Sequence, residues 1–185
     1  MKTLNTVAAH VIETERLQLR APNRGDLETY LRLAGDPRVA LKTTGIPHPL
    51  READANEWLA RANYGTRRTF VIARKEDAGM IGAVHLETRP DRVSAEAGLW
   101  IGVPYWRRGY ATEALRGILR DAFGERGLLY ITTGIPTGNP AAERVLRKAG
   151  LKFESLVEGG FRREGIIQDR VNHGLFADEW EALHC

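Results

Sequence analysis

The segment YWRRGYATEAL, residues 105–115, places two arginines and a glycine just before an apolar-periodic run. Gly109 has no Cβ, so the backbone can approach a bulky ligand there. A helix beginning near Ala111 would leave its first amides unpaired, and those amides and the helix dipole favour an anion. Arg107 and Arg108 add positive charge. The segment therefore predicts a pyrophosphate cradle; a glycine turn before an ordinary helix is the alternative.

Glu96 and His85 are the side chains that could accept a proton near such a cradle. They fall on neighbouring predicted strands, and Glu96 shares a strand face with Trp100. A carboxylate can act as a general base through one water, and histidine titrates near neutral pH. A solvated strand glutamate and a structural histidine are the alternatives. The sequence has no GxxxxGK(S or T), GxGxxG or HExxH motif and no zinc-type spacing, so we expect no metal.

Hydrophobic periodicity indicates the elements that must position these residues. The predicted strands are 16–20, 69–75, 80–89, 92–103, 128–135, 151–158 and 166–176. The predicted helices are 23–36, 51–63, 112–126 and 139–150. Asn23 and Asn139 are expected to cap helices, Pro37 to end the first helix, and Gly159-Gly160 to connect the last two strands. This order predicts an α+β fold with a parallel strand pair inside a mostly antiparallel sheet.

The composition is that of one soluble domain spanning residues 1–185. Hydrophobic residues make up 43% and charged residues 28%, which is typical of globular proteins. The net charge of +3 and the dispersed arginine pairs favour an anionic ligand and argue against nucleic acid as a partner. We expect no signal peptide and no membrane contact, because no apolar run is long enough. The single cysteine, Cys185, favours a reducing compartment, so we predict a cytoplasmic protein.

Two segments carry a family resemblance: AEAGLWIGVPYWRRGYATEALRGILRDAF and GNPAAERVLRKAGL. They resemble the GNAT N-acetyltransferases, most closely the branch that acetylates the N-termini of ribosomal proteins. The opening ETERLQLRAPNRGDLE and the DEW near the end are also similar to that branch, so the resemblance covers nearly the whole chain. The family's cradle pattern, (Q or R)-x-x-G-x-(G or A), is met at Gly109 and Ala111, but its first position holds Trp106. This departure matters little where backbone amides bind the ligand.

The resemblance implies a GNAT-like three-layer fold, with helices on both faces of a mixed sheet that contains a splayed parallel pair. It implies acetyl-CoA as co-substrate, with pantetheine between the splayed strands and a strand amide polarising the thioester carbonyl. The implied cofactor contacts are Trp100, Ile101, Gly102, Val103, Arg107, Arg108, Gly109, Tyr110, Ala111, Thr112, Asn139 and Arg144. Glu96 matches the glutamate of the family's AEIGYW-like stretch, so it is the first candidate base and His85 the second.

The acceptor of such an enzyme must be a neutral amine. An α-amino group titrates near pH 7.7–8.0 and lysine near 10.4, so deprotonation at pH 7 costs about 1 and nearly 5 kcal/mol respectively. We therefore expect a primary α-amine, first of all a protein or peptide N-terminus. A small-molecule amine (polyamine, antibiotic or amino-acid derivative) and a non-catalytic acyl-CoA-binding module are the alternatives. The loops at 43–50 and 159–166 would choose among acceptors, and an exposed sheet edge could support a homodimer.

The general acid is the one role for which the resemblance suggests no residue. The positions where relatives often carry a tyrosine and a serine hold Leu146 and Ala142, neither of which can protonate a thiolate. A thiol with a pKa near 8.5 is already a fair leaving group, so solvent could suffice. The other candidates are Tyr105, Tyr110 and Tyr130.

Overall fold

A mixed sheet of eight strands, in the order β1-β2-β3-β4-β5-β6-β8-β7, forms the middle layer of the molecule. The strands are β1 (Ile12–Glu13), β2 (Leu17–Arg20), β3 (Arg67–Arg74), β4 (Met80–Thr88), β5 (Ser94–Ile101), β6 (Tyr130–Pro136), β7 (Lys152–Arg163) and β8 (Ile166–Phe176). The structure is a computed structural model that describes residues 10–43, 45–163 and 165–184. The predictions about a signal peptide and about Cys185 fall on residues outside these ranges.

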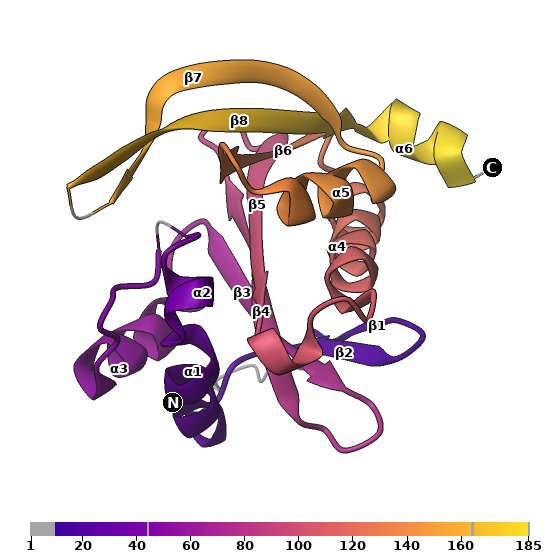
Figure 1. Cartoon of the computed structure of the whole chain (residues 1–185). Coiled ribbons are helices and arrows are strands. Elements are labelled where there is room, and N and C mark those ends of the chain that lie inside the picture. Colours follow the sequence, from indigo (N-terminus) through magenta and orange to yellow (C-terminus); the bar gives the residue numbers. More distant parts are fainter. Residues whose placement is uncertain (1–9, 44, 164, 185) are drawn as a thin grey trace, which may run out of the picture.

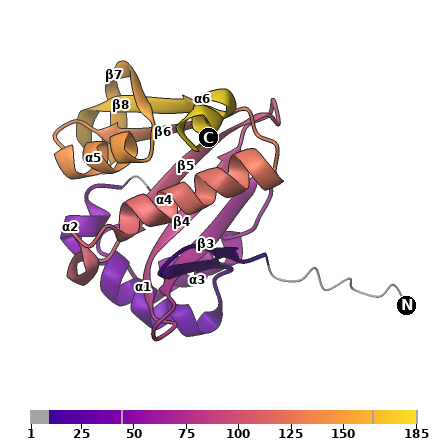
Figure 2. The same cartoon turned by 90° about the vertical axis from the view of Figure 1, so that its right-hand side faces the viewer.

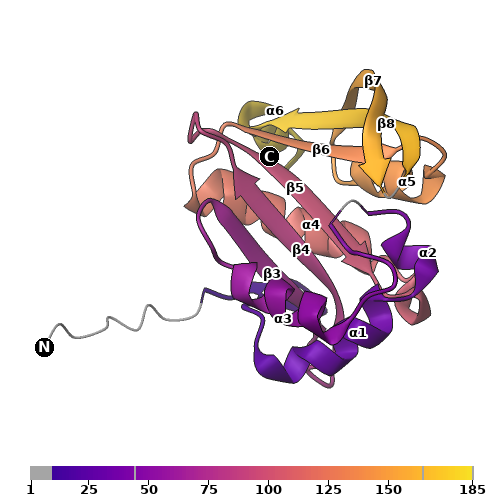
Figure 3. The same ribbon diagram turned by 90° about the vertical axis from the view of Figure 1, so that its left-hand side faces the viewer.

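Helices cover both faces of this sheet (Figure 1). They are η1 (Arg24–Asp26), α1 (Leu27–Ala34), α2 (Pro37–Ala40), α3 (Glu52–Arg61), η2 (Val103–Tyr105), α4 (Tyr110–Arg120), η3 (Asp121–Glu125), α5 (Pro140–Lys148) and α6 (Ala177–His184). Helix α4 crosses the sheet on one face (Figure 2), and α1 and α3 lie over the opposite face (Figure 3). The predicted three-layer α+β fold with helices on both faces is confirmed.

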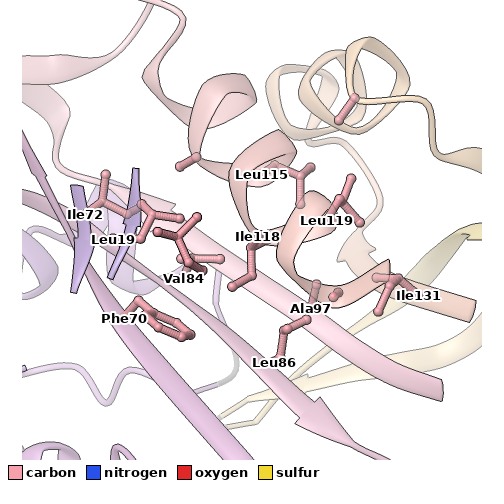
Figure 4. Packing of buried hydrophobic residues seen from close by; sticks show 14 of the residues in the cluster. Leu19, Phe70, Ile72, Val84, Leu86, Ala97, Leu115, Ile118, Leu119 and Ile131 are labelled. Atoms are coloured by element: carbon pink, nitrogen blue, oxygen red, sulfur yellow. The ribbon is translucent and has the colours of Figure 1, made fainter. Parts of the chain in front are cut away.

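The two faces of the sheet bury separate cores, because strand side chains alternate in direction. Ala97 of β5 belongs to the core beneath α4, together with Leu115 and Ile118 of that helix (Figure 4). Trp100 of the same strand packs against the other core, which contains Tyr30 of α1. The alternation predicted along β5 is therefore confirmed, and it directs odd-numbered side chains to α4 and even-numbered ones to α1 and α3.

Strands β5 and β6 are the parallel pair, and they separate soon after they meet. Their pairing runs only from Ser94 opposite Tyr130 to Glu96 opposite Thr132. Both strands continue past this point and diverge (Figure 3). The edge of β5 that faces β6 is therefore unpaired from Ala97 onward, which is the splay that the family resemblance implies.

The first predicted helix ends where expected, but α2 was not predicted and the limits of α4 differ. Helix α1 ends at Ala34, just before Asp36 and Pro37, as predicted. Pro37 then occupies the first turn of α2, where proline's missing N–H is not needed, and the Asp36 side chain accepts from the Arg38 amide at 2.9 Å. Helix α4 begins at Tyr110 rather than 112, and its end widens into the π-helical turn η3. Gly127 follows with φ +62°, as expected of a residue after a helix end.

The C-terminal third also differs from the prediction. Gly159 and Gly160 do not connect two strands; they lie inside β7, where the register with β8 shifts between Val157 and Phe161. Glycine inside a strand commonly marks such a bulge. Helix α6 follows β8 without a predicted counterpart, and its Trp180 is buried in the core beneath α4.

Candidate active site

The splay opens a cavity of about 680 Å³. Its lining begins at the first turn of α4, passes the facing edges of β5 and β6, and reaches α1 and α3 across the sheet. One end is therefore formed by the predicted cradle, and the other by side chains far away in sequence. We call these the cradle end and the acceptor end.

The cradle end is built from main-chain amides. Arg107 has φ +61° and Gly109 has φ +82°, so two left-handed residues in three fold the loop tightly before α4. Within the described residues, the amides from Arg107 to Thr112 donate to no other protein group, and the first helical bond runs from the Glu113 amide to the Gly109 carbonyl. Free amides converging at a helix start form an anion site, so the residues present fit a pyrophosphate group.

Arg16 holds this loop from outside the cavity. Its Nε donates to Glu113 Oε2 at 2.8 Å, and its Nη1 donates to the Arg108 carbonyl at 3.1 Å. The guanidinium also lies 4.6 Å from the centre of the Tyr110 ring. The left-handed conformation before α4 is thus supported by a residue just before β2.

Most of the predicted cofactor residues line the cavity. Those that do are Trp100, Ile101, Arg107, Gly109, Tyr110, Ala111, Thr112, Asn139 and Arg144. Arg108, Gly102 and Val103 lie outside the lining, and Gly102 is so close to Leu33 that a Cβ would meet its Cδ2 at 2.9 Å. Asn139 caps α5 by accepting from the Ala142 amide at 3.3 Å. The Trp106 indole donates to the Ile101 carbonyl at 2.6 Å, which ties the loop to the end of β5.

Glu96 lies where β5 and β6 part, and it is paired. Arg170 of β8 donates from Nη2 to Glu96 Oε1 at 2.7 Å. The Glu96 side chain keeps 39% of its surface exposed, so its second oxygen is open to a water or to an amine. The structure therefore places the first candidate base in the cavity, with a guanidinium beside it.

His85 lies one row deeper on the same face and depends on a glycine for its position. It is opposite Gly98 in the β4–β5 ladder, and a Cβ on Gly98 would lie 2.4 Å from the His85 Cε1 atom. Burial, with a smaller effect of Arg67, lowers the pKa of His85 to about 3. The imidazole is therefore neutral at pH 7, and its ring nitrogens have no hydrogen-bond partner among the described residues.

Aromatic side chains form the wall of the acceptor end. Tyr30 of α1 stacks on Trp58 of α3 with ring centroids 4.1 Å apart, and it meets Trp100 edge-on at 5.9 Å. Burial raises the pKa of Tyr30 to about 12, so its hydroxyl stays protonated. Thr69 pairs with His85 in the sheet, and its buried hydroxyl has no hydrogen-bond partner in the described part of the chain. The wall thus offers an apolar surface next to open polar groups.

The described residues of the segments 43–50 and 159–166, which are predicted to choose the acceptor, meet at the acceptor end. Phe161 of β7 is buried and lines the cavity, as does Ile46. Arg163 of β7 donates from Nη1 to the carbonyls of Ala40 and Thr43, the latter at 2.8 Å. This contact holds the β7–β8 hairpin against the segment after α2.

Among the described residues, no side chain stands out as the general acid that would protonate the leaving thiolate. Leu146 and Ala142 do line the cavity, so the two positions named from the resemblance are apolar in place. Tyr105 and Tyr110 also line it, whereas Tyr130 lines a neighbouring polar cavity and donates to Glu154 Oε2 at 2.5 Å. Tyr105 and Tyr110 are therefore better placed than Tyr130.

Comparison with known proteins decides the family. A sequence profile of the acetyltransferase (GNAT) domain matches residues 16–152, which is most of the chain. The chain is a GNAT acetyltransferase. GNAT acetyltransferases use acetyl-CoA, and the free amides at the start of α4 fit that co-substrate's pyrophosphate.

Three relatives show how widely this acetyltransferase family varies. The FsC-acetyl coenzyme A-N(2)-transacetylase of Aspergillus fumigatus is 27% identical over 191 residues, covering 94% of this chain and 79% of that protein. The structure of a protein assigned as a ribosomal-protein-serine acetyltransferase from Vibrio cholerae superposes with a TM-score of 0.78 at 20% identity, covering 90% and 97% of the two chains. Spermidine N-acetyltransferase from Vibrio cholerae, solved with CoA and spermine, also gives 0.78, at 22% identity and coverage of 90% and 98%.

Sequence reasoning about this acetyltransferase missed much of the acceptor end. The residues missed are Tyr30, Trp58, Thr69, Phe161 and Arg170. The available signal was the pair of mid-strand glycines, Gly98 and Gly134, since such glycines often mark close approach of a side chain or ligand. Among the described residues, no helix is long and apolar enough to cross a membrane, and no group of His, Cys, Asp and Glu could hold a metal ion.

Proposed function

We propose that this acetyltransferase acetylates an α-amine, with a protein or peptide N-terminus as the first candidate. The supporting observation is the charge at the acceptor end. Four basic side chains line it, namely Arg38, Lys42, Arg67 and Arg170. Among the described residues, Glu96 is the only acidic side chain in this lining. Positive walls repel a polycation. The lining therefore disfavours a polyamine such as the spermine that one structural relative binds.

The transfer is a direct attack on the thioester. The amine nitrogen bonds to the carbonyl carbon as the carbon–sulfur bond breaks, the electron pair leaves with sulfur, and the amine's proton passes through water to Glu96. His85 is the second candidate for that proton. A free β5 amide in the splay polarises the carbonyl, and the amides from Arg107 to Thr112 hold the pyrophosphate.

The properties of the two candidate bases support an α-amine. Burial lowers the pKa of His85 to about 3, so this imidazole is a weak base, and one oxygen of the Glu96 carboxylate already accepts a hydrogen bond from Arg170 Nη2. At pH 7 such groups must provide about 1 kcal/mol to deprotonate an α-amine but nearly 5 kcal/mol for lysine. The positive walls add to this preference, because like charge disfavours a bound ammonium.

Two peptides and one polyamine test the proposal. The first peptide has a free N-terminus and no lysine, the second a blocked N-terminus and one lysine, and thiol release from acetyl-CoA is measured at pH 7 and equal concentration. We expect the first peptide to react fastest. Faster turnover of the second peptide or of spermine would contradict the assignment of an α-amine acceptor.

A small amino-acid derivative is the second candidate acceptor. The observation that favours it is Arg170, whose guanidinium is open to the cavity beside Glu96. A free amino acid reaches both groups at once, which a long peptide with a neutral first residue does not.

A further inference from the structure

Arg170 is held in one orientation where β5 and β6 part. Its Nε donates to Asn172 Oδ1 at 2.9 Å and its Nη2 to Glu96 Oε1 at 2.7 Å. It crosses β6 at Gly134, where a Cβ would lie 1.7 Å from the Arg170 Nε. Asn172 is itself fixed by donating to Ser155 Oγ at 3.2 Å. The absence of a side chain at Gly134 thus leaves room for a guanidinium between the two splayed strands.

The remaining donors of Arg170 face two cavities. A guanidinium has five N–H groups, and those of Nη1 have no partner among the described residues. The side chain is 29% exposed and lines both the main cavity and a polar one of about 400 Å³. Arg170 and Glu96 form the wall that these cavities share. An anion entering from either side therefore meets a guanidinium that is already oriented.

The chemistry of this pair is specific. A guanidinium binds carboxylates through two parallel hydrogen bonds, and fixing it beforehand reduces the ordering cost of binding. Next to it, the exposed oxygen of Glu96 suits an ammonium. Arg89 and Glu154 also line the polar cavity, but the Glu154 carboxylate already accepts from the Tyr130 hydroxyl. Cation and anion side by side are complementary to an acceptor that carries both charges close together.

We propose that the acceptor is an α-amine with a carboxylate on the same residue, and that Arg170 positions it by binding that carboxylate while the amine lies at Glu96. This inference rests on the proposed function and narrows its substrate class. Two sources have this chemistry: a free α-amino acid, and a peptide whose first residue is Asp or Glu. The aromatic wall of Tyr30, Trp58 and Trp100 would contact the rest of the acceptor.

The test compares Arg170→Gln with the wild-type enzyme on matched acceptors. One pair is phenylalanine and phenylalaninamide, and the other is two lysine-free peptides that begin with Asp and with Asn. Because the amide and acid forms differ in amine pKa, each acceptor is compared between enzymes, not with its partner. Loss of a hydrogen bond to a charged group should lower kcat/KM for the carboxylate acceptor roughly tenfold to a hundredfold more than for its amide, and any loss common to both acceptors reports the pairing of Arg170 with Glu96.

Arg170→Lys and Arg24→Gln complete the design. Lysine keeps the positive charge but cannot form the two parallel hydrogen bonds of a guanidinium. An intermediate loss of kcat/KM on the carboxylate acceptor is therefore expected. Arg24 is an exposed arginine of η1 that lines neither cavity, and its variant should match wild type on every acceptor. Calorimetric CoA affinity reports that each variant has folded.

Three outcomes would overturn the inference. They are an equal loss on acid and amide acceptors, no loss on either, and wild-type turnover confined to acceptors without a carboxylate. If no α-amine is acetylated, the proposed function itself fails. Titration of phenylalanine and its amide into the CoA-loaded enzyme separates the two cases, because carboxylate-dependent binding that Arg170→Gln removes is measured without turnover.

Discussion

The two ends of the cavity are built from different parts of the chain. The cradle end uses consecutive main-chain amides, from Arg107 to Thr112, at the start of one helix. The acceptor end uses side chains from α1, α3, β3, β4, β5, β7 and β8. Side-chain identity matters little where amides bind, which explains why Trp106 can replace the family's usual Gln or Arg. At the acceptor end a single substitution changes the chemistry, so the ends should respond separately to mutation.

Glu96→Gln should give the largest loss of activity. The substitution keeps shape and the hydrogen bond from Arg170 but removes the charge that accepts the proton, so kcat should fall about a hundredfold. The pH–rate profile should shift upward, because more of the amine must then lose its proton to solvent. CoA affinity, measured by calorimetry, should stay within about twofold. An unchanged pH–rate profile would move the role of base to His85 or to solvent.

Gly109→Val tests the other end. At φ +82° a β-branched residue is strongly disfavoured, and its Cβ would lie 3.3 Å from Arg16 Nη2. The strain of roughly 1–2 kcal/mol, with loss of the amide arrangement, should weaken CoA binding roughly tenfold to a hundredfold. Gly127→Val is the matched control: its φ is +62° and its Cβ would meet no described atom within 4 Å. It should share the strain and keep CoA affinity; equal affinity of both variants for CoA would remove the cradle assignment.

Gly98→Ala tests the acceptor end without altering the cradle end. The new methyl would lie 2.4 Å from His85 Cε1, so the imidazole must move. Displacing a group at the acceptor end should lower kcat/KM roughly tenfold without changing CoA affinity. In a His85→Ala background there is space for the new methyl, so Gly98→Ala should no longer lower kcat/KM. Additive effects of the two substitutions would show that the clash does not act through His85.

His85→Gln should have the smallest effect at pH 7 and a measurable one in acid. Burial, with a smaller effect of Arg67, lowers the pKa of His85 to about 3. The unfolded chain therefore binds a proton at this residue near pH 6.5, and the folded chain does not. Stability due to the neutral form is intact above pH 6.5 and lost as the pH falls toward 3. Between pH 7 and 5 the wild type should lose about 2 kcal/mol more than the variant, measured by urea unfolding. Equal losses of stability in the wild type and in the variant would contradict a buried, neutral His85.

The contrast also explains what the sequence could predict. The cradle and the cap at Asn139 depend on contiguous segments whose local patterns are informative, and the splay was implied by the family resemblance. Arg170 could not be placed, because its contact with Glu96 joins residues 74 apart and depends on the space above Gly134. Helix α2 was missed because Pro37 is compatible with a helix start as well as a helix end. Local rules were sufficient for one end of the cavity and not for the other.

Arg16 has a consequence for how the enzyme acquires its ligand. It braces the cradle through Glu113, which lies 97 residues later in the chain. Closing so long a loop is entropically costly, and long-range contacts of this kind form slowly. A fragment that contains α4 but lacks the first strands would have the amides without the brace. Recovery of CoA affinity during refolding should therefore report the docking of the N-terminal strands onto α4, and nucleotide binding becomes a property of the assembled domain.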